Sequence, residues 1–167
     1  MEADMARNKK PRKQYRPRPS NRCASLGPIQ RAAQALIDRE PMSDDQARDL
    51  GIAYHLSFER MLKGAGDEET WSTVTCSLNI ALVLAERGIG AEFEAQIVRA
   101  LDGAFRAKQR ADQTGRWVYD GDAIHDIREA FAVHDEQMRV ALVGEVRAAL
   151  NEVHRRIDAG NVYREAA

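Results

Sequence analysis

The sequence feature that most constrains the fold is a row of mainly apolar side chains that recurs every three or four residues towards the carboxyl end. Because an α-helix has 3.6 residues per turn, this spacing places the whole row on one helix face. No proline interrupts it, so it predicts either one helix of nearly forty residues or two helices broken near 134–136 or Gly144. The row comprises Ile124, Ile127, Phe131, His134, Met138, Leu142, Val146, Leu150, Val153 and Ile157.

Clear start and stop signals predict three helices upstream of this row. Ser43 and the glutamine three residues later have the spacing of a capping box, and "KGAGD" at 63–67 ends the helix that they begin. Asp67 is a candidate N-cap for the next helix, which "RGIG" at 87–90 ends, and a further helix is expected at 91–113. The residues expected on the buried faces of these helices are Ala47, Leu50, Tyr54, Phe58, Met61 and Leu62, then Trp71, Val74, Leu78, Ala81, Leu82 and Ala85, then Phe93, Ile97, Ala100, Leu101, Ala104 and Phe105.

A shorter helical pattern comes first, and a loop precedes the last row. Pro28 suits the first turn of a helix, and Asp120 in the loop "TGRWVYDGD" is the expected N-cap of the last segment. No long alternating β pattern and no internal repeat occurs. We therefore expect an all-α fold, an antiparallel bundle of four to six helices over residues 29–160, followed by a short tail at 161–167. The first helix would carry its apolar residues on one face: Ile29, Ala33, Leu36 and Ile37.

The apolar content of two segments suggests self-association. The helix over 67–86 is apolar around most of its circumference, which is typical of a helix at the centre of a bundle or in an interface between copies. A continuous last helix would be about 60 Å long at 1.5 Å per residue, so that it would overhang its neighbours. An apolar overhang needs a partner, and a symmetric dimer is the commonest one. The predicted homodimer interface is Leu142, Val146, Leu150 and Val153.

Charge divides the chain into two parts. Residues 1–30 hold eight Lys or Arg and two carboxylates, a net charge of +6, whereas the remaining 137 residues carry −7. Residues 1–28 are also rich in proline and poor in large apolar groups, which predicts a disordered basic arm. Such an arm, over residues 7–22, suits nucleic acid, an acidic protein surface or the chain's own acidic body, or it merely solubilises the chain. The candidate nucleic-acid-binding residues are Lys9, Lys10, Arg12, Lys13, Tyr15, Arg16 and Arg18.

No pattern in the sequence favours catalysis. The glycines form neither a phosphate-binding loop nor a dinucleotide fingerprint, and Cys76 lies where a core residue is expected. Asp122, His125, Asp126 and Glu129 share one helix face, but the Glu-x-x-His pairs of di-metal bundles do not occur. We therefore expect no catalytic residues, no metal and no cofactor. The longest apolar run, at 80–85, is too short to cross a membrane, so a cytoplasmic protein is expected.

Four segments carry a resemblance to known sequences: "NKKPRKQYRPRP", "RGIGAEF", the loop "TGRW-YDGD" and "EVHRRI". In these the chain resembles a group of small uncharacterised bacterial proteins of prophage and plasmid-like regions, some of which are labelled transcriptional regulators. The resemblance implies an origin in a mobile element and carries over no site residues. A compact helix-turn-helix is not found, because the breaks at 64–67 and 87–90 lie more than twenty residues apart. We interpret the chain as a non-enzymatic accessory or regulatory protein with a nucleic-acid-binding arm; the alternative is an adaptor or inhibitor that binds proteins through its bundle.

Overall fold

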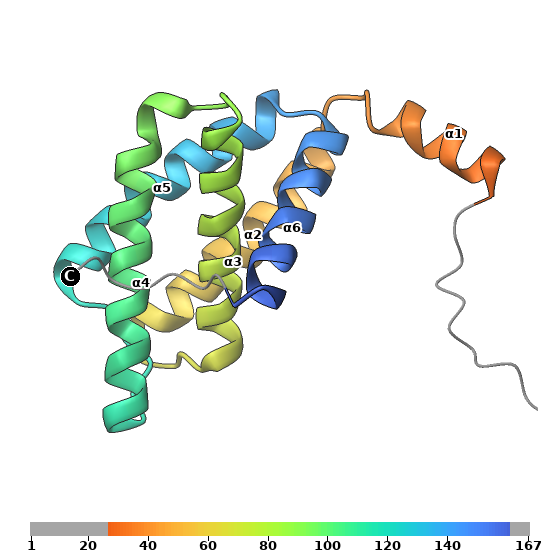
Figure 1. The fold of residues 1–167 in the computed structure, drawn as a ribbon. Helices are drawn as coiled ribbons and strands as arrows, with labels where there is room; N and C mark the ends of the chain where they lie inside the picture. Colours follow the sequence, from red (N-terminus) through yellow and green to blue (C-terminus); the bar gives the residue numbers. More distant parts are fainter. Residues whose placement is uncertain (1–26, 161–167) are drawn as a thin grey trace, which may run out of the picture.

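The computed structural model describes residues 27–160, which fold as the predicted all-α bundle without strands in that range (Figure 1). The predicted basic arm, apart from its last two residues, and the tail at 161–167 lie outside the described residues. The elements are α1 (Pro28–Ile37), α2 (Asp44–Leu62), α3 (Glu68–Glu86), a 3₁₀ turn η1 (Ala91–Phe93), α4 (Glu94–Thr114), α5 (Gly121–Val140) and α6 (Val143–Asp158).

The predicted N-caps begin the helices at the expected positions. The Ser43 hydroxyl accepts a hydrogen bond from the Gln46 amide at 3.2 Å, and the Gln46 side chain accepts one from the Ser43 amide at 3.1 Å. Asp67 caps α3 through the Thr70 amide at 2.8 Å, and Asp120 caps α5 through the Ala123 amide at 2.8 Å. Each bond satisfies an amide that the helix itself leaves without an acceptor.

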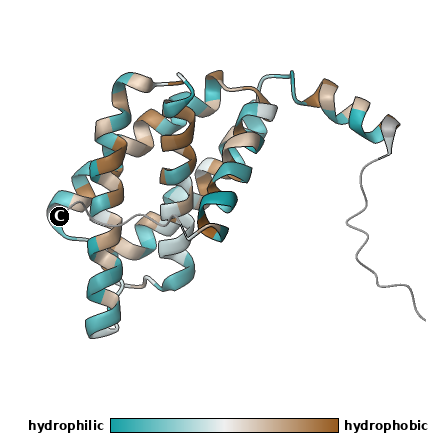
Figure 2. Ribbon diagram, in the orientation of Figure 1, coloured by the Kyte–Doolittle hydropathy of each residue, from teal (hydrophilic) through white to brown (hydrophobic). Residues whose placement is uncertain are grey.

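Helix α3 lies at the centre of the bundle and contacts α2, α4, α5 and α6. Its main face joins a core cluster with α2, α4 and α5, in which Leu78, Ile97 and Phe131 are buried. A second cluster joins α3 to α5 and α6 around Leu84 and Val153. The apolar circumference of α3 is thus explained by its central position, and Figure 2 shows hydrophobic residues concentrated in its carboxyl-terminal half.

The last apolar row forms two helices, so the alternative of one long helix is wrong. Ala141 and Leu142 both have extended backbone, with ψ of 147° and 151°, and α6 folds back to pack against α3. The break therefore falls close to Gly144, as the second alternative predicted. The segment between α1 and α2 stabilises this break, because the Met42 amide donates a hydrogen bond to the Ala141 carbonyl at 3.3 Å.

The same break removes the overhang on which the predicted dimer interface was based. Val153 is buried within its own chain, and Leu142, Val146 and Leu150 are half-buried. Val146 packs against the second core cluster. The homodimer itself stays a prediction.

Two residues expected in the core are exposed. Leu50 is 46% exposed, although Ala47 in the first turn of α2 packs against the second core cluster, and the fully buried residues of α2 begin only at Tyr54. Phe93 belongs to the 3₁₀ turn before α4 and not to α4, which rotates it away from the buried face of that helix.

Candidate functional site

Helix α1 projects from the bundle and leaves its apolar face in solvent (Figure 1). Ile29 is 85% exposed, Leu36 66% and Ile37 44%. These three residues and the exposed Ala33 recur at the helical spacing that the sequence indicated. The face that would ordinarily hold such a helix against a core therefore has no partner within residues 27–160.

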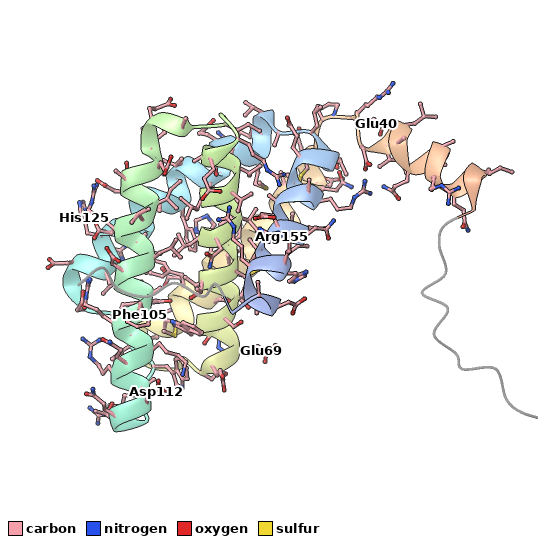
Figure 3. The ribbon with its side chains drawn as sticks, in the orientation of Figure 1. Glu40, Glu69, Phe105, Asp112, His125 and Arg155 are labelled. Carbon is pink, nitrogen blue, oxygen red and sulfur yellow. The ribbon has the colours of Figure 1, made fainter. Side chains whose placement is uncertain are left out.

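The junction between α1 and the bundle is firmly held. The Gly144 amide donates to the Asp38 carbonyl at 3.1 Å, the Val143 amide donates to the Glu40 carbonyl at 3.0 Å, and Arg147 pairs with the Asp38 carboxylate. A Cβ on Gly144 would lie 2.8 Å from the Asp38 carbonyl oxygen, so only glycine permits this approach. Figure 3 shows Glu40 at this junction. The end of α1 is thus fixed on the first turn of α6.

The outer face of α2 carries a second exposed apolar surface. Leu50 is 46% exposed, Ile52 56% and Leu56 59%. Sequence reasoning missed this surface, although Ile52 and Leu56 lie off the predicted core face of α2 and could have marked it. We call the exposed apolar residues of α1 the α1 face (Ile29, Ala33, Leu36, Ile37). Those of α2 are the α2 face (Leu50, Ile52, Leu56).

The cations of the bundle are mostly engaged by carboxylates. Eleven of the sixteen Lys and Arg residues within 27–160 form ion pairs, and that range carries a net charge of −7. Arg156, for example, binds Glu86 at 3.0 Å and Glu152 at 2.9 Å. Hydrogen bonds from Arg155 and Arg156 lower the pKa of the Glu152 carboxyl to about 2. The described surface therefore offers few free cations to a polyanion. The candidate residues Lys9, Lys10, Arg12, Lys13, Tyr15, Arg16 and Arg18 lie outside it.

A polar cluster joins α2 to α5. The Asp135 carboxylate accepts a hydrogen bond from the Tyr54 hydroxyl and lies 3.1 Å from Nε2 of His55. Burial and the neighbouring carboxylate raise the pKa of Tyr54, which keeps the phenol protonated. No nucleophile joins this cluster, so its geometry suits the attachment of α2 to α5.

A buried histidine adjoins that cluster. His134 is almost completely buried, Nδ1 lies 3.2 Å from Gln137 Oε1, and burial lowers the pKa of His134 to about 4. The Gln137 amide in turn donates to the carbonyls of Ala81 at 3.0 Å and Ile89 at 2.7 Å. His134 is thus a core histidine held by a hydrogen bond.

The acidic face of α5 does not gather into a metal site. His125 points outward from α5 (Figure 3) and pairs with Glu129 at 3.3 Å, while Asp126 pairs with Arg99 at 3.7 Å. Among residues 27–160, no three His, Cys, Asp or Glu side chains come together in a way that could hold a metal ion.

A mainly apolar hollow lies between α3, α4 and α6 and has a volume of about 400 Å³, which is within the range of small-molecule sites. Burial raises the pKa of the Cys76 thiol, so that it stays protonated and unreactive at neutral pH. Both cations at the hollow are engaged, Lys108 by Asp112 at 2.7 Å and Arg156 by its two carboxylates. The lining residues are Trp71, Ser72, Thr75, Cys76, Asn79, Leu101, Phe105, Lys108, Val153, Arg156 and Ile157.

Comparison with known proteins adds no further assignment. No family model, curated protein or solved structure matches the chain significantly. Within the described range, no helix combines the length and apolar character needed to cross a bilayer. The candidate site is therefore judged on its own geometry: an anchored, projecting helix with an exposed apolar face, beside an acidic bundle.

Proposed function

We propose that the chain is a non-enzymatic accessory or regulatory protein that contacts nucleic acid through its basic arm. The observation that carries this proposal is the separation of charge. The arm has a net charge of +6, whereas residues 27–160 have −7 and most of their cations are already paired. Phosphate binding requires free Lys and Arg side chains, so the arm is the part of the chain suited to it.

The position of α1 supports this use of the arm. The arm precedes Pro28, and the first turn of α1 is the part of that helix farthest from the bundle (Figure 1). The described chain thus begins at the end of α1 that lies farthest from the acidic bundle. The assignment to a cytoplasmic protein of a bacterial mobile element rests on the resemblance alone and is part of the proposal.

A salt titration of duplex DNA binding tests the proposal. The logarithm of the affinity is expected to fall linearly with the logarithm of salt, by about 0.9 per contacted phosphate. Replacing Arg12, Lys13, Arg16 and Arg18 by Gln is expected to reduce that slope by up to about 3.6. As a matched control, Arg116→Gln with Arg128→Gln removes two bundle cations for which the described residues provide no ion pair, and the slope should stay unchanged. Absence of binding by the unmodified chain at low salt contradicts the proposal.

The second candidate is an adaptor or inhibitor that binds another protein, and the exposed α1 and α2 faces favour it. Deletion of residues 1–28 separates the two candidates. It abolishes nucleic-acid retention under the first proposal, whereas it leaves partner binding intact under the second.

A further inference from the structure

Helix α1 is too short to be stable on its own. Its ten residues extend about 15 Å, and isolated helices shorter than about 12 to 15 residues are marginal in water. Helices of this length are ordinarily stabilised by packing an apolar face, yet the α1 face is exposed. A partner for the α1 face is therefore needed to explain why the sequence maintains both the helix and its apolar stripe.

The chain's own α2 face cannot serve as that partner. The bonds of Asp38 to Gly144 and Arg147, and of Glu40 to Val143, hold the end of α1 on α6 and direct the helix away from the bundle (Figure 1). Folding α1 back onto α2 would require the backbone to change direction beside these anchored residues. The described residues therefore provide no partner for the α1 face.

The α2 face has the size and charge to receive an α1 face. The α1 face extends about 12 Å from Ile29 to Ile37, and the α2 face about 9 Å from Leu50 to Leu56. Helix α1 contains Arg31 and no carboxylate, whereas α2 begins with acidic residues, of which Asp44 and Asp49 have no ion pair within 27–160. The two faces are thus similar in length, and the helices that carry them differ in sign of net charge, +1 for α1 and −2 for α2.

We propose that two copies of the chain form a symmetric dimer in which α1 of each copy packs on α2 of the other. A two-fold axis produces both contacts at once, so that each chain buries its α1 face and its α2 face. This arrangement leaves Val153 in its own core and places the dimer interface away from the α6 residues predicted earlier. It does not depend on nucleic-acid binding, although a dimer would carry two arms.

The apolar area involved is of the order that a stable dimer needs. Full burial of a Leu or Ile side chain corresponds to roughly 60–120 Å², from 1.5–3 kcal/mol at about 25 cal/mol per Å². At their observed exposures, the six large residues of the two faces supply on the order of 200–400 Å² per chain. A standard interface buries about 800 Å² per partner, of which a little over half is apolar. The two faces provide roughly half to nine-tenths of that apolar share.

Sedimentation of the full chain tests the dimer. The unmodified chain is expected to sediment as a dimer at tens of micromolar. Leu36→Asp and Leu56→Asp should each raise the dissociation constant at least about tenfold, because each buries an unpaired charge. Both residues are exposed in the single chain, so the variants should keep their circular dichroism spectrum and melting behaviour. Val140→Asp is the matched control: it replaces an equally exposed apolar residue outside both faces and should leave the dimer intact.

Cross-linking identifies which faces meet, independently of variant stability. In a background of Cys23→Ser and Cys76→Ala, chains with Leu36→Cys and chains with Leu56→Cys are oxidised separately and as a mixture. A disulfide dimer that forms in the mixture, but in neither chain alone, supports α1-to-α2 packing. A monomeric unmodified chain, equally efficient cross-linking of Leu36→Cys chains alone, or a dimer unaffected by Leu36→Asp and Leu56→Asp overturns the proposal.

Discussion

The bundle and α1 obtain their helical structure in different ways. In the bundle, every helix from α2 to α6 buries residues against a neighbour, and α3 is surrounded by four others. Helix α1 has an equally regular apolar stripe but leaves it in solvent, and only the residues at its end are bonded to α6. The comparison shows that an amphipathic pattern indicates a helix and a face to be covered, without indicating which molecule covers it.

The largest expected effect on the free energy of unfolding is that of losing a buried side chain of the bundle. Leu78 is completely buried in the main cluster, and Leu78→Ala should lower the free energy of unfolding by about 2–5 kcal/mol through lost burial and the cavity that remains. Val140→Ala, at an exposed position of α5, should change it by less than about 0.5 kcal/mol. Urea denaturation of both variants measures the difference. Equal effects would show that the described core does not stabilise the bundle.

This contrast also explains what the sequence could predict. The caps at Ser43, Asp67 and Asp120 act through hydrogen bonds within one turn, so local residues sufficed to locate the helix starts. The sequence offered a break near Gly144 as one alternative but could not decide for it, because part of the stabilisation at Ala141 comes from the Met42 amide, about a hundred residues away. The predicted binding residues of the arm lie outside the described structure. The exposure of the α1 face was missed because periodicity does not distinguish a buried stripe from an exposed one.

Acid is expected to weaken the bundle through His134. Because burial lowers the pKa of His134 from 6.5 to about 4, the unfolded chain binds a proton between these values that the folded chain does not. Stability should therefore fall as pH falls from about 6.5 to about 4, by up to about 3 kcal/mol. His55 and Asp135 adjoin this ring and act on its pKa in opposite directions.

Denaturation curves across this pH range, for the unmodified chain and for His134→Asn, measure the contribution of His134. The variant cannot take up the proton, so its stability should depend less on pH within the window. An identical slope in both chains would show that His134 is not the group that titrates.

A smaller effect is expected at the junction that connects the two regions. Gly144→Ala would place a Cβ 2.8 Å from the Asp38 carbonyl oxygen, so the linker must shift even though alanine favours helix. We expect a loss of about 1–2 kcal/mol and faster hydrogen exchange at the amides of Val143 and residue 144. Gly121→Ala, where a Cβ would meet nothing within 4 Å, is the matched control and should be neutral or slightly stabilising. Identical behaviour of the two variants would contradict the role given to the close approach.

The most direct test of the central claim, that α1 is completed by a second copy, is hydrogen exchange of the full chain as a function of its concentration. In dilute solution, where monomers prevail, the amides of α1 should exchange fast, whereas those of α3 stay protected. As the concentration rises through the dimer dissociation constant, protection should appear in α1 and increase on the α2 face, with α3 unchanged. Protection of α1 that is the same at every concentration, or absent at all of them, would contradict the account.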